Sequence, residues 1–525
     1  MEVDENQDIP DLKLQSPRIP DPYPFTYLAF SLLLALILRI SFVSFLQDQR
    51  IKRLGKRAPK IDSFVPLGLD VVVRGIIALR RHKIFQHWRD DYFPPGIWTV
   101  ETTIVGQRTI FTADPENIKA ILSSQFIEFG KGPAFHNEWK PFLGDGIFAV
   151  DGSLWQTSRQ LLRPQFTRSR VSDLDCFEAH FQTLLTVMNR QGPIVDMSDL
   201  FLRYALDITT DFLLGAGVDS LTSRDQAFAT AFDEVQRIHT VWSRSFGLKR
   251  LIVFPRYRAH LRVIDDFVNA FIDRALAMTP AELEAVGDKN YTFLQELARV
   301  TRDRKVIRDQ IVNVILAGRD TTAGTLAWSI YELSNSPQST TRLRAEILKT
   351  IGPNRPPTPE DLKSMPYLRS VIDETLRLYP SVPFNLRRPL VDTTLPRGGG
   401  PDGSEPLPVL AGTIISYSPL VMQRRPDLYP PVSGDFADPA VFSPERWRVW
   451  QPKSQGYIPF NAGPRVCLGQ QFALTEMSYV LCRLFQRFAR VESHMFAIDG
   501  GQPDIRTEIT IRPGKGVHVA FYEDE

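Results

Sequence analysis

Cys467 has the surroundings that most clearly suit chemistry in this sequence. The chain holds three cysteines, Cys176, Cys467 and Cys482. We identify no cysteine–cysteine or cysteine–histidine pair at zinc-like spacing, and we therefore expect neither a zinc knuckle nor an iron–sulfur cluster. A single thiolate can still bind a heme iron, because the porphyrin supplies the other equatorial ligands.

The residues around Cys467 suit that role. Gly463 and Gly469 lack a β-carbon, so their backbone can approach a flat macrocycle closely. Arg465 could pair with a heme carboxylate. The apolar pattern predicts a helix over 468–485, which would place Cys467 at a helix N-terminus, where free N–H groups and the dipole stabilise a thiolate. The alternative is a buried structural cysteine before a helix.

The order of Phe460, Gly463, Arg465 and Cys467 resembles the heme-thiolate signature of the cytochrome P450 family. The resemblance implies a heme b with Cys467 as the axial iron ligand and with Phe460, Gly463 and Arg465 against the cofactor. Some fatty-acid hydroxylases of the family esterify their heme through a glutamate. Ala317 stands at that place here, so we expect a non-covalent heme.

A second group of residues lies within a long helix predicted over 306–333. Its centre contains Gly318, Thr321 and Gly324, although an interior glycine costs about 1 kcal/mol relative to alanine and threonine is also a poor helix former. Sequences often weaken a helix in this way at a site. The resemblance implies that Asp320 and Thr321 relay protons. The alternative is a helix–helix contact through small residues.

Glu374 and Arg377 are three residues apart on a helix predicted over 365–379 and share one face. Taken alone, they would form a surface ion pair of small energy. The family resemblance instead places them in a buried triad, completed by Arg446 of the Pro-Glu-Arg motif. Trp447 follows that motif where phenylalanine is more usual. Such a triad would be structural, and breaking it would leave a buried charge unpaired.

Further donors resemble the family's partners of the heme propionates. Trp155 and Arg159 are four residues apart and would point the same way from a helix. Arg387 lies in the extended segment that follows the Glu-x-x-Arg helix, and the adjacent Arg388 leaves the register open. Taken alone, each arginine would be a surface residue. All these matches run in the family's order over most of the chain.

Composition favours one large, mostly helical domain. The 525 residues are 43% apolar, and no linker, repeat or low-complexity tract is visible. Short strand-like runs occur at 97–110, 409–417 and 505–521. We therefore expect a mainly α fold with small β-sheets, the cytochrome P450 fold, as a single catalytic domain. The net charge of +2 indicates no nucleic-acid partner.

The N-terminus predicts a membrane anchor. Residues 24–46 are almost all apolar apart from Arg39, and about 20 such residues span a bilayer. Residues 1–23 are acidic and 47–66 are basic, with Pro59 and Pro66 forming a hinge before a catalytic domain over 67–525. The positive-inside rule puts that domain in the cytosol and the acidic tail in the lumen of the endoplasmic reticulum. A core or amphipathic helix is the alternative.

The resemblance implies a monooxygenase that inserts one oxygen atom of O2 into a C–H bond of a lipophilic substrate. No flavin or nicotinamide domain is visible, so electrons from NADPH would arrive through a membrane-bound cytochrome P450 reductase, with cytochrome b5 as a further candidate partner. The candidate pocket residues are mostly apolar and also suit plain core packing: Phe135, Ile147, Phe148, Val314, Ala317, Val382, Phe384 and Ile509.

Within the family, the sequence is most similar to fungal enzymes that hydroxylate alkanes and fatty acids at the chain end. The matching stretches are 143–148, 162–166, 317–322, 392–400 and 467–471. A fungal biosynthetic monooxygenase acting on a polyketide, terpenoid or similar intermediate is the second interpretation. A peroxide isomerase or a gas sensor is the third, and Asp320 and Thr321 argue against it, since such proteins need no proton delivery.

Overall fold

The computed structural model describes residues 23–65, 68–166, 174–223, 226–245, 252–285, 292–434, 436–453 and 455–524. The chain forms two compact units, Met1–Arg53 and Leu54–Glu525. We call the second of these the main unit. The predicted acidic tail, apart from its last residue, and Pro66 lie outside the described residues.

The first unit consists, in its described part, of helix α1 (Tyr23–Leu54), whose last residue already belongs to the main unit. Among the described residues, one helix is long and apolar enough to cross a membrane: it includes the 25 residues Phe30–Leu54, with a mean hydropathy of 2.0. The helix thus continues eight residues past the predicted end at 46, because no helix-breaking residue occurs before Gly55.

The segment 55–65 is part of the main unit and differs from the predicted hinge. The Ile61 N–H donates to the Glu101 carbonyl and the Glu101 N–H to the Pro59 carbonyl, both at 2.9 Å. This stretch of chain therefore pairs with the edge of β1 (Thr99–Ile104). The prediction took Pro59 and Pro66 as marks of a hinge. A proline lacks only the N–H donor, however, and the Pro59 carbonyl still accepts a hydrogen bond from β1.

The main unit is mostly helical, as the sequence predicts. Its helices are α2 (Leu69–Arg80), α3 (Ile84–Gln86), α4 (Pro115–Lys119), α5 (Pro133–Leu143), α6 (Gly152–Leu162), α8 (Asp175–Gln191), α9 (Met197–Leu214), α10 (Ala227–Ser243), α11 (Tyr257–Ala277), α12 (Pro280–Ala285), α13 (Phe293–Val300), α14 (Arg304–Asn335), α15 (Pro337–Ile351), α16 (Pro359–Lys363), α17 (Pro366–Leu378), α18 (Pro419–Met422), α19 (Arg446–Val449), α20 (Gln470–Arg487) and α21 (Phe496–Asp499).

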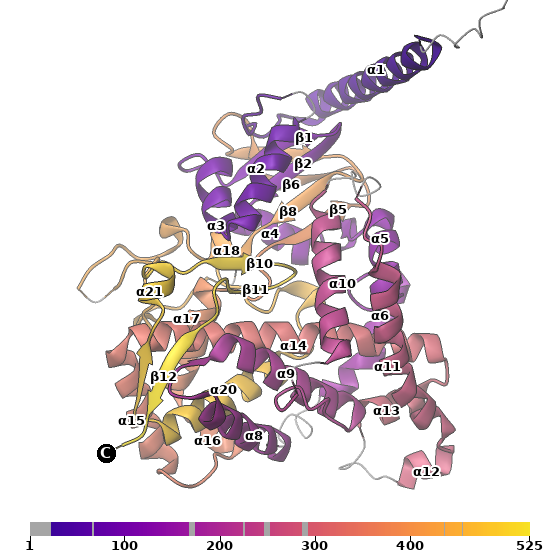
Figure 1. Ribbon diagram of the computed structural model, residues 1–525. Coiled ribbons are helices and arrows are strands. Elements are labelled where there is room, and N and C mark those ends of the chain that lie inside the picture. Colours follow the sequence, from indigo (N-terminus) through magenta and orange to yellow (C-terminus); the bar gives the residue numbers. More distant parts are fainter. Residues whose placement is uncertain are drawn as a thin grey trace, which may run out of the picture. The chain divides into compact units, whose positions relative to one another are not determined.

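The strands form small sheets. They are β1, β2 (Gln107–Thr112), β3 (Phe129–Gly130), β4 (Val195–Asp196), β5 (Asn385–Pro389), β6 (Thr393–Gly399), β7 (Glu405–Val409), β8 (Ile414–Tyr417), β9 (Arg490–Ser493), β10 (Ile505–Thr507), β11 (Ile511–Pro513) and β12 (His518–Tyr522). The largest sheet has five strands in the order β1-β2-β8-β5-β3, and only β2 and β8 pair in parallel. Figure 1 shows β1, β2, β5, β6 and β8 gathered near α2 and α4.

The predicted strand runs are each divided by turns. The run at 97–110 becomes the hairpin β1–β2, in which Val105 and Gly106 have φ angles of 49° and 76°. Positive φ at both central residues is the geometry of a tight hairpin turn. The run at 409–417 breaks between β7 and β8, and the run at 505–521 forms β10, β11 and β12.

Helix α14 runs through the centre of the helical part and packs against α9, α11, α17 and α20 (Figure 1). The Asp303 carboxylate caps its N-terminus by accepting from the N–H groups of Lys305 and Val306. Pro337 begins the next helix just beyond its end. Most residues of α14 are buried on every side, which is why its sequence shows only a weak apolar stripe.

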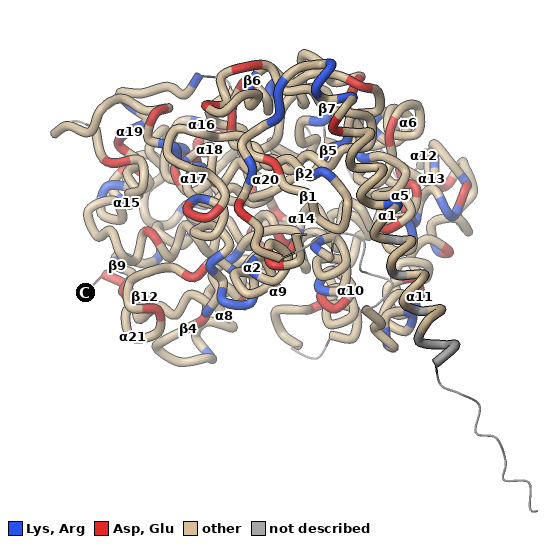
Figure 2. The backbone as a smooth tube through the Cα atoms, turned by 90° about the horizontal axis from the view of Figure 1, so that it is seen from above, with Lys and Arg blue, Asp and Glu red and all other residues tan. Residues whose placement is uncertain are grey.

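Charges of both signs alternate along the main unit (Figure 2), in keeping with the net charge of +2. The most deeply buried charges form the predicted triad, which is confirmed. The Glu374 carboxylate pairs with Arg377 at 2.8 Å and with Arg446 at 3.0 Å, and all three side chains are fully buried. Trp447 donates its indole N–H to the same carboxylate at 3.1 Å.

The triad orders a long irregular segment. Arg377 donates to the Pro439 carbonyl at 2.7 Å, and Arg446 donates to the carbonyls of Ala437, Asp438 and Val441 at 3.0 Å. Burial alone would raise the pKa of Glu374, but the two guanidinium groups hold it below its ordinary value. The carboxylate is therefore charged, and its pairing lets both arginines satisfy backbone carbonyls that no strand or helix satisfies.

Replacing Glu374 by glutamine should destabilise the main unit by about 3–5 kcal/mol, because two buried guanidinium groups lose their only full negative charge. The thermal unfolding midpoint and the yield of soluble protein measure this. The matched control is Glu360→Gln, which removes an exposed pair with Lys363 at 3.8 Å and should leave both quantities unchanged. Equal behaviour of the two variants would contradict a structural role for the triad.

Candidate functional site

A cavity of about 700 Å³ lies inside the main unit, with Cys467 on its wall and α14 along it. The wall is mostly apolar and includes aromatic side chains such as Trp88, Tyr92 and Phe111. The structure places all the predicted pocket residues on this wall: Phe135, Ile147, Phe148, Val314, Ala317, Val382, Phe384 and Ile509. A concave apolar space with few polar groups is typical of a small-molecule site.

The loop before α20 holds Cys467 by its backbone. The Cys467 N–H donates to the Phe460 carbonyl at 3.0 Å, and the Val466 N–H donates to the Gly463 carbonyl at 3.0 Å. Gly463 has a φ of 65°, and a β-carbon there would lie 1.8 Å from the Leu122 carbonyl oxygen. Glycine is thus required at 463 for a close approach to the neighbouring backbone. The close approach of Gly463 to the cofactor stays a prediction.

The Cys467 side chain is exposed, although the protein surrounds it, because its free surface faces the cavity. Burial raises the pKa of its thiol, while the Gly469 N–H and the nearby Arg159 guanidinium lower it. Cys482, in contrast, is fully buried within α20, and burial raises its pKa to about 12. Of the three cysteines, only Cys467 lines the cavity.

A cluster of cations lies on the same side of the cavity as Cys467. Lys131 and the buried Arg387 both donate to the neutral side-chain oxygen of Asn385 at 2.9 Å. Arg465 pairs with Asp151 at 2.6 Å, and that carboxylate also accepts from the Lys131 N–H. Three cations thus share one acid among the described residues.

The cation cluster is electrostatically uncompensated. Burial lowers the pKa of Lys131 well below its ordinary value, and the charges of Arg387 and Arg465 lower it further. Burial and the neighbouring Arg387 lower the pKa of Arg465 to about 10. Buried like charges are costly unless an anion neutralises them, so this end of the cavity suits a ligand with two carboxylates.

Trp155 and Arg159 both line the cavity from α6, as their spacing predicts. Trp155 is buried, with the Arg465 guanidinium 4.8 Å from its ring centroid. Arg159 donates to the Val466 carbonyl at 3.0 Å and therefore contacts the cysteine loop itself. Arg388, next to Arg387 on β5, also lines the cavity, but its guanidinium donates to the Gly412 carbonyl at 2.7 Å, outside the cluster.

Thr321 reaches the cavity from α14, and its hydroxyl donates to the Ala317 carbonyl one turn earlier at 2.6 Å. The helix is continuous across this residue. The interior glycines serve packing: a β-carbon on Gly318 would lie 2.8 Å from the Thr209 hydroxyl of α9, and one on Gly324 would lie 2.6 Å from the Ile511 carbonyl. The small-residue contact that the sequence left as the alternative is therefore present beside the threonine.

Asp320 faces away from the main cavity. It lines a small polar pocket with Asp233 and Arg512, and it accepts a hydrogen bond from Gln236. Glu508 and Thr510 line both this pocket and the main cavity. Burial raises the pKa of Asp320, although the adjacent Arg319 guanidinium opposes the shift.

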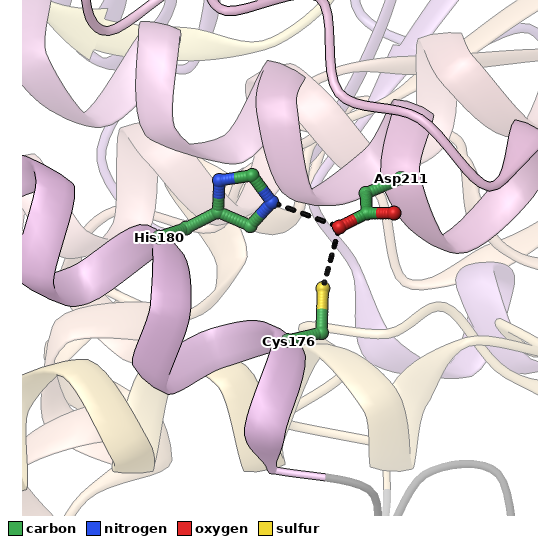
Figure 3. Close-up of side chains that lie close together, drawn as sticks. All are labelled: Cys176, His180 and Asp211. Carbon is green, nitrogen blue, oxygen red and sulfur yellow. Dashed lines mark hydrogen bonds and ion pairs between the residues drawn. The ribbon is translucent and has the colours of Figure 1, made fainter.

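A separate cluster links α8 to α9. His180 Nε2 lies 3.1 Å from Asp211 Oδ2, and the Cys176 thiol donates to the same oxygen at 3.5 Å (Figure 3). The three ligand atoms lie within 4.8 Å of one another and could hold a soft divalent cation. The prediction that no cysteine pairs with a histidine was therefore wrong, since Cys176 and His180 are four residues apart on α8 and share one face. Only the contribution of Asp211 required the fold. None of the three residues lines the cavity.

The sequence analysis also missed Lys131, Asp151 and Asn385. Lys131 stands between two glycines, and Asp151 precedes α6. The sequence therefore indicated ordinary loop residues at both positions. The only signal was local: a lysine and an asparagine in otherwise apolar surroundings. Their meeting depends on the pairing of β3 with β5.

Known proteins resemble the chain along most of its length. The family model for cytochrome P450 matches residues 73–496. The chain is 53% identical over 496 residues to cytochrome P450 monooxygenase pvhE of Talaromyces variabilis, covering 91% of this chain and 92% of that protein. It is 37% identical over 487 residues to cytochrome P450 52A12 of Debaryomyces hansenii, covering 89% and 92%.

Solved structures share the fold. The crystal structure of the cytochrome P450DA heme domain aligns with a TM-score of 0.73 at 20% identity, covering 90% of this chain and 97% of that one. At this identity the likeness concerns the fold alone. The architecture is therefore that of the cytochrome P450 heme domain.

A helical fold around an apolar cavity, with a thiol on its wall, offers a place where a heme could bind through a cysteine thiolate. The chain belongs to the cytochrome P450 family. It is a monooxygenase, an oxidoreductase that uses heme b with a cysteine thiolate and electrons supplied from NAD(P)H by a reductase. Membership also implies a lipophilic substrate.

The residues present fit that cofactor. Heme b carries two propionate carboxylates, and the cation cluster leaves two positive charges without an acidic partner among the described residues. The Cys467 thiol faces the same cavity. The two negative charges of the propionates would thus neutralise the positive charge of Lys131, Arg387 and Arg465 that Asp151 leaves unpaired.

We predict that Arg387→Ala releases heme to an apomyoglobin acceptor about tenfold faster, because one charge-assisted partner of the propionates is lost. Arg388→Ala is the matched control, since its side chain donates outside the cluster. Cys467→Ser removes the thiol, and its rate of heme release shows how large the effect would be if the axial ligand were lost. Equal heme release from the two arginine variants would exclude Arg387 as the propionate partner.

Proposed function

We propose that this cytochrome P450 hydroxylates the chain end of a fatty acid or alkane, with Cys467 as the axial ligand of its heme. The observation that carries the proposal is the cavity: about 700 Å³, mostly apolar, with a thiol exposed only to its interior. An elongated hydrocarbon chain needs such a mostly apolar wall to leave water.

Lys131, Arg387 and Arg465 would hold the propionates, and Trp155 and Phe460 would pack beside the ring. Arg159 would keep the cysteine loop in place through the Val466 carbonyl. When bound, the heme supplies the oxidation of the C–H bond by O2, and a thiolate ligand favours O–O cleavage. Ala317 on the wall offers no carboxylate for esterification, so the heme would be non-covalent.

The net reaction puts one oxygen atom of O2 into the substrate C–H bond and releases the other as water, so it consumes two electrons and two protons. Burial raises the pKa of Asp320, so this carboxyl takes up a proton more readily than an exposed one. The Thr321 hydroxyl is the donor on the cavity side. The space between them is shared by Glu508 and Thr510, and a proton would pass there.

The apolar helix α1 would anchor the protein to the membrane of the endoplasmic reticulum, with the main unit in the cytosol and the acidic tail in the lumen. In this arrangement the predicted anchor, residues 24–46, is followed by the basic stretch that leads into the main unit. The electron donor would be the membrane-bound NADPH–cytochrome P450 reductase of the same face, with cytochrome b5 as an additional donor.

A biosynthetic monooxygenase that oxidises a polyketide, terpenoid or other lipophilic intermediate is the second candidate. One observation favours it: the relative that is 53% identical carries a name outside the 52A series. Relatives of the 52A series, at 37–42% identity, stand beside the resemblance to chain-end hydroxylases on which the first candidate rests.

We expect Thr321→Ala to uncouple turnover, because it removes the hydroxyl that the proposed relay needs on the cavity side of α14. Product formed per NADPH consumed should fall by about 10²-fold, with peroxide released instead. The ratio is measured in a reconstituted system by following NADPH, peroxide and product together. Thr321→Ser keeps the hydroxyl and should stay coupled, whereas full coupling in the alanine variant would remove Thr321 from the relay.

Incubations with microsomes that contain the protein and a reductase distinguish the two candidate substrate classes. We expect ω-hydroxylated products from lauric acid or dodecane, identified by mass spectrometry, because the apolar cavity fits an extended chain. An extract of a strain lacking the gene is incubated in parallel. Consumption of an accumulated metabolite without any ω-hydroxy product would favour the biosynthetic candidate.

A further inference from the structure

Two polar side chains at the end of α10 line the cavity away from the cation cluster. Thr240 and Arg244 are four residues apart, and the backbone of Arg244 keeps helical angles of −93° and −3° as the helix ends. Both residues therefore lie on one side of α10, and both line the cavity. Neither was singled out by the sequence.

The polar atoms of these two residues are not fully used. Arg244 Nη2 donates to the Glu508 carbonyl at 2.9 Å, but Arg244 Nη1 is buried without a hydrogen-bond partner among the described residues. The Thr240 hydroxyl is also buried and has no partner there. Leaving a buried donor without a partner destabilises the protein, and more so when the donor is charged.

The nearest acidic side chain is already engaged. The Glu508 carboxylate accepts from Arg506 Nε and Nη2 at 3.0 and 2.6 Å, and Arg512 lies 3.8 Å from it. Within the described part of the chain, no carboxylate lies at ion-pair distance from Arg244. Burial lowers the pKa of Arg244 to about 10, and even so the guanidinium is charged at neutral pH.

Arg244 also lies apart from the groups assigned to the heme. It contacts the turn between β10 and β11, which contains Glu508 and contributes Ile509 to the cavity wall. The cation cluster instead lies against β5 and the cysteine loop. A positive charge on the substrate-facing wall of an apolar cavity requires an anion from outside the chain.

We propose that Arg244, assisted by the Thr240 hydroxyl, binds the carboxylate of the substrate, so that the enzyme selects lipid acids over hydrocarbons of the same length. The inference rests on the proposed chain-end hydroxylation and names its substrate class. A carboxylate held at this end of the cavity leaves the apolar remainder of the substrate to extend along the wall formed by residues such as Phe135, Val314 and Phe384.

The test measures binding to the purified holoenzyme by the substrate-induced spectral shift. Saturated acids of graded chain length are compared with their methyl esters, which keep the chain and lose the charge. Arg244→Gln should weaken acid binding about 10- to 100-fold and change ester binding by less than about twofold, because a charge-assisted hydrogen bond is lost only with the acid. Thr240→Val should act in the same direction with a smaller loss.

Two variants control for structure. Arg244→Lys keeps the charge and should restore most of the preference for acids. Arg237→Gln removes an exposed arginine of the same helix, which pairs with Glu234 at 2.8 Å, and should bind both series as the wild type does. The spectrum of the reduced carbon-monoxide complex verifies in every variant that the heme keeps its thiolate ligand.

The outcomes separate this inference from the proposed function. Equal loss of acid and ester binding in Arg244→Gln would make Arg244 a structural residue and overturn the inference. A wild-type enzyme that binds no acid more tightly than its ester would also overturn it, even if chain-end products form. Selective loss of acid binding without ω-hydroxylation would support the carboxylate site and reject the chain-end reaction.

Discussion

The carboxylate of Glu374 is the charge on which the order of the site depends. It is fully buried, and it neutralises the two guanidinium groups of Arg377 and Arg446. Those guanidinium groups donate to carbonyls of an irregular segment around Pro439 and Val441. A long stretch without regular secondary structure has no ladder of its own to satisfy its backbone, so charged side chains supply the donors.

The same principle extends toward the cysteine. Gln423 donates to the carbonyls of Leu376 and Arg377 and accepts from the Ile458 N–H at 2.8 Å, just before the cysteine loop. The loop is then closed by the hydrogen bond from Cys467 to Phe460. The buried triad, Gln423 and the cysteine loop are thus linked partly by hydrogen bonds and partly by the chain itself.

Positive charges line the cavity at two separate places. Lys131, Arg387 and Arg465 form a cluster whose missing counter-charge matches the propionates of a heme. Arg244 is a further charge elsewhere on a mostly apolar wall, and its Nη1 atom has no hydrogen-bond partner among the described residues. An apolar interior makes each unpaired charge expensive, so each is informative about the ligand that would neutralise it. The first points to the cofactor and the second to the substrate.

Much of this protein is determined by local sequence. The helix that contains Thr321 and the common face of Glu374 and Arg377 follow from spacing within one element. The roles of Cys467 and of the buried triad followed from the resemblance of their motifs to a known family. The apolar run of α1 likewise predicts a helix of membrane-spanning length. Such inferences need no knowledge of how distant elements pack.

Tertiary structure alone decided the rest. Lys131 meets Arg387 because β3 pairs with β5, and Cys176 and His180 meet Asp211 because α8 packs on α9. Asp320 lines the small polar pocket and Thr321 lines the main cavity, because different elements cover these two sides of α14. Local spacing cannot specify such contacts, because burial and the loss of solvent around a charge arise only when separate elements pack together.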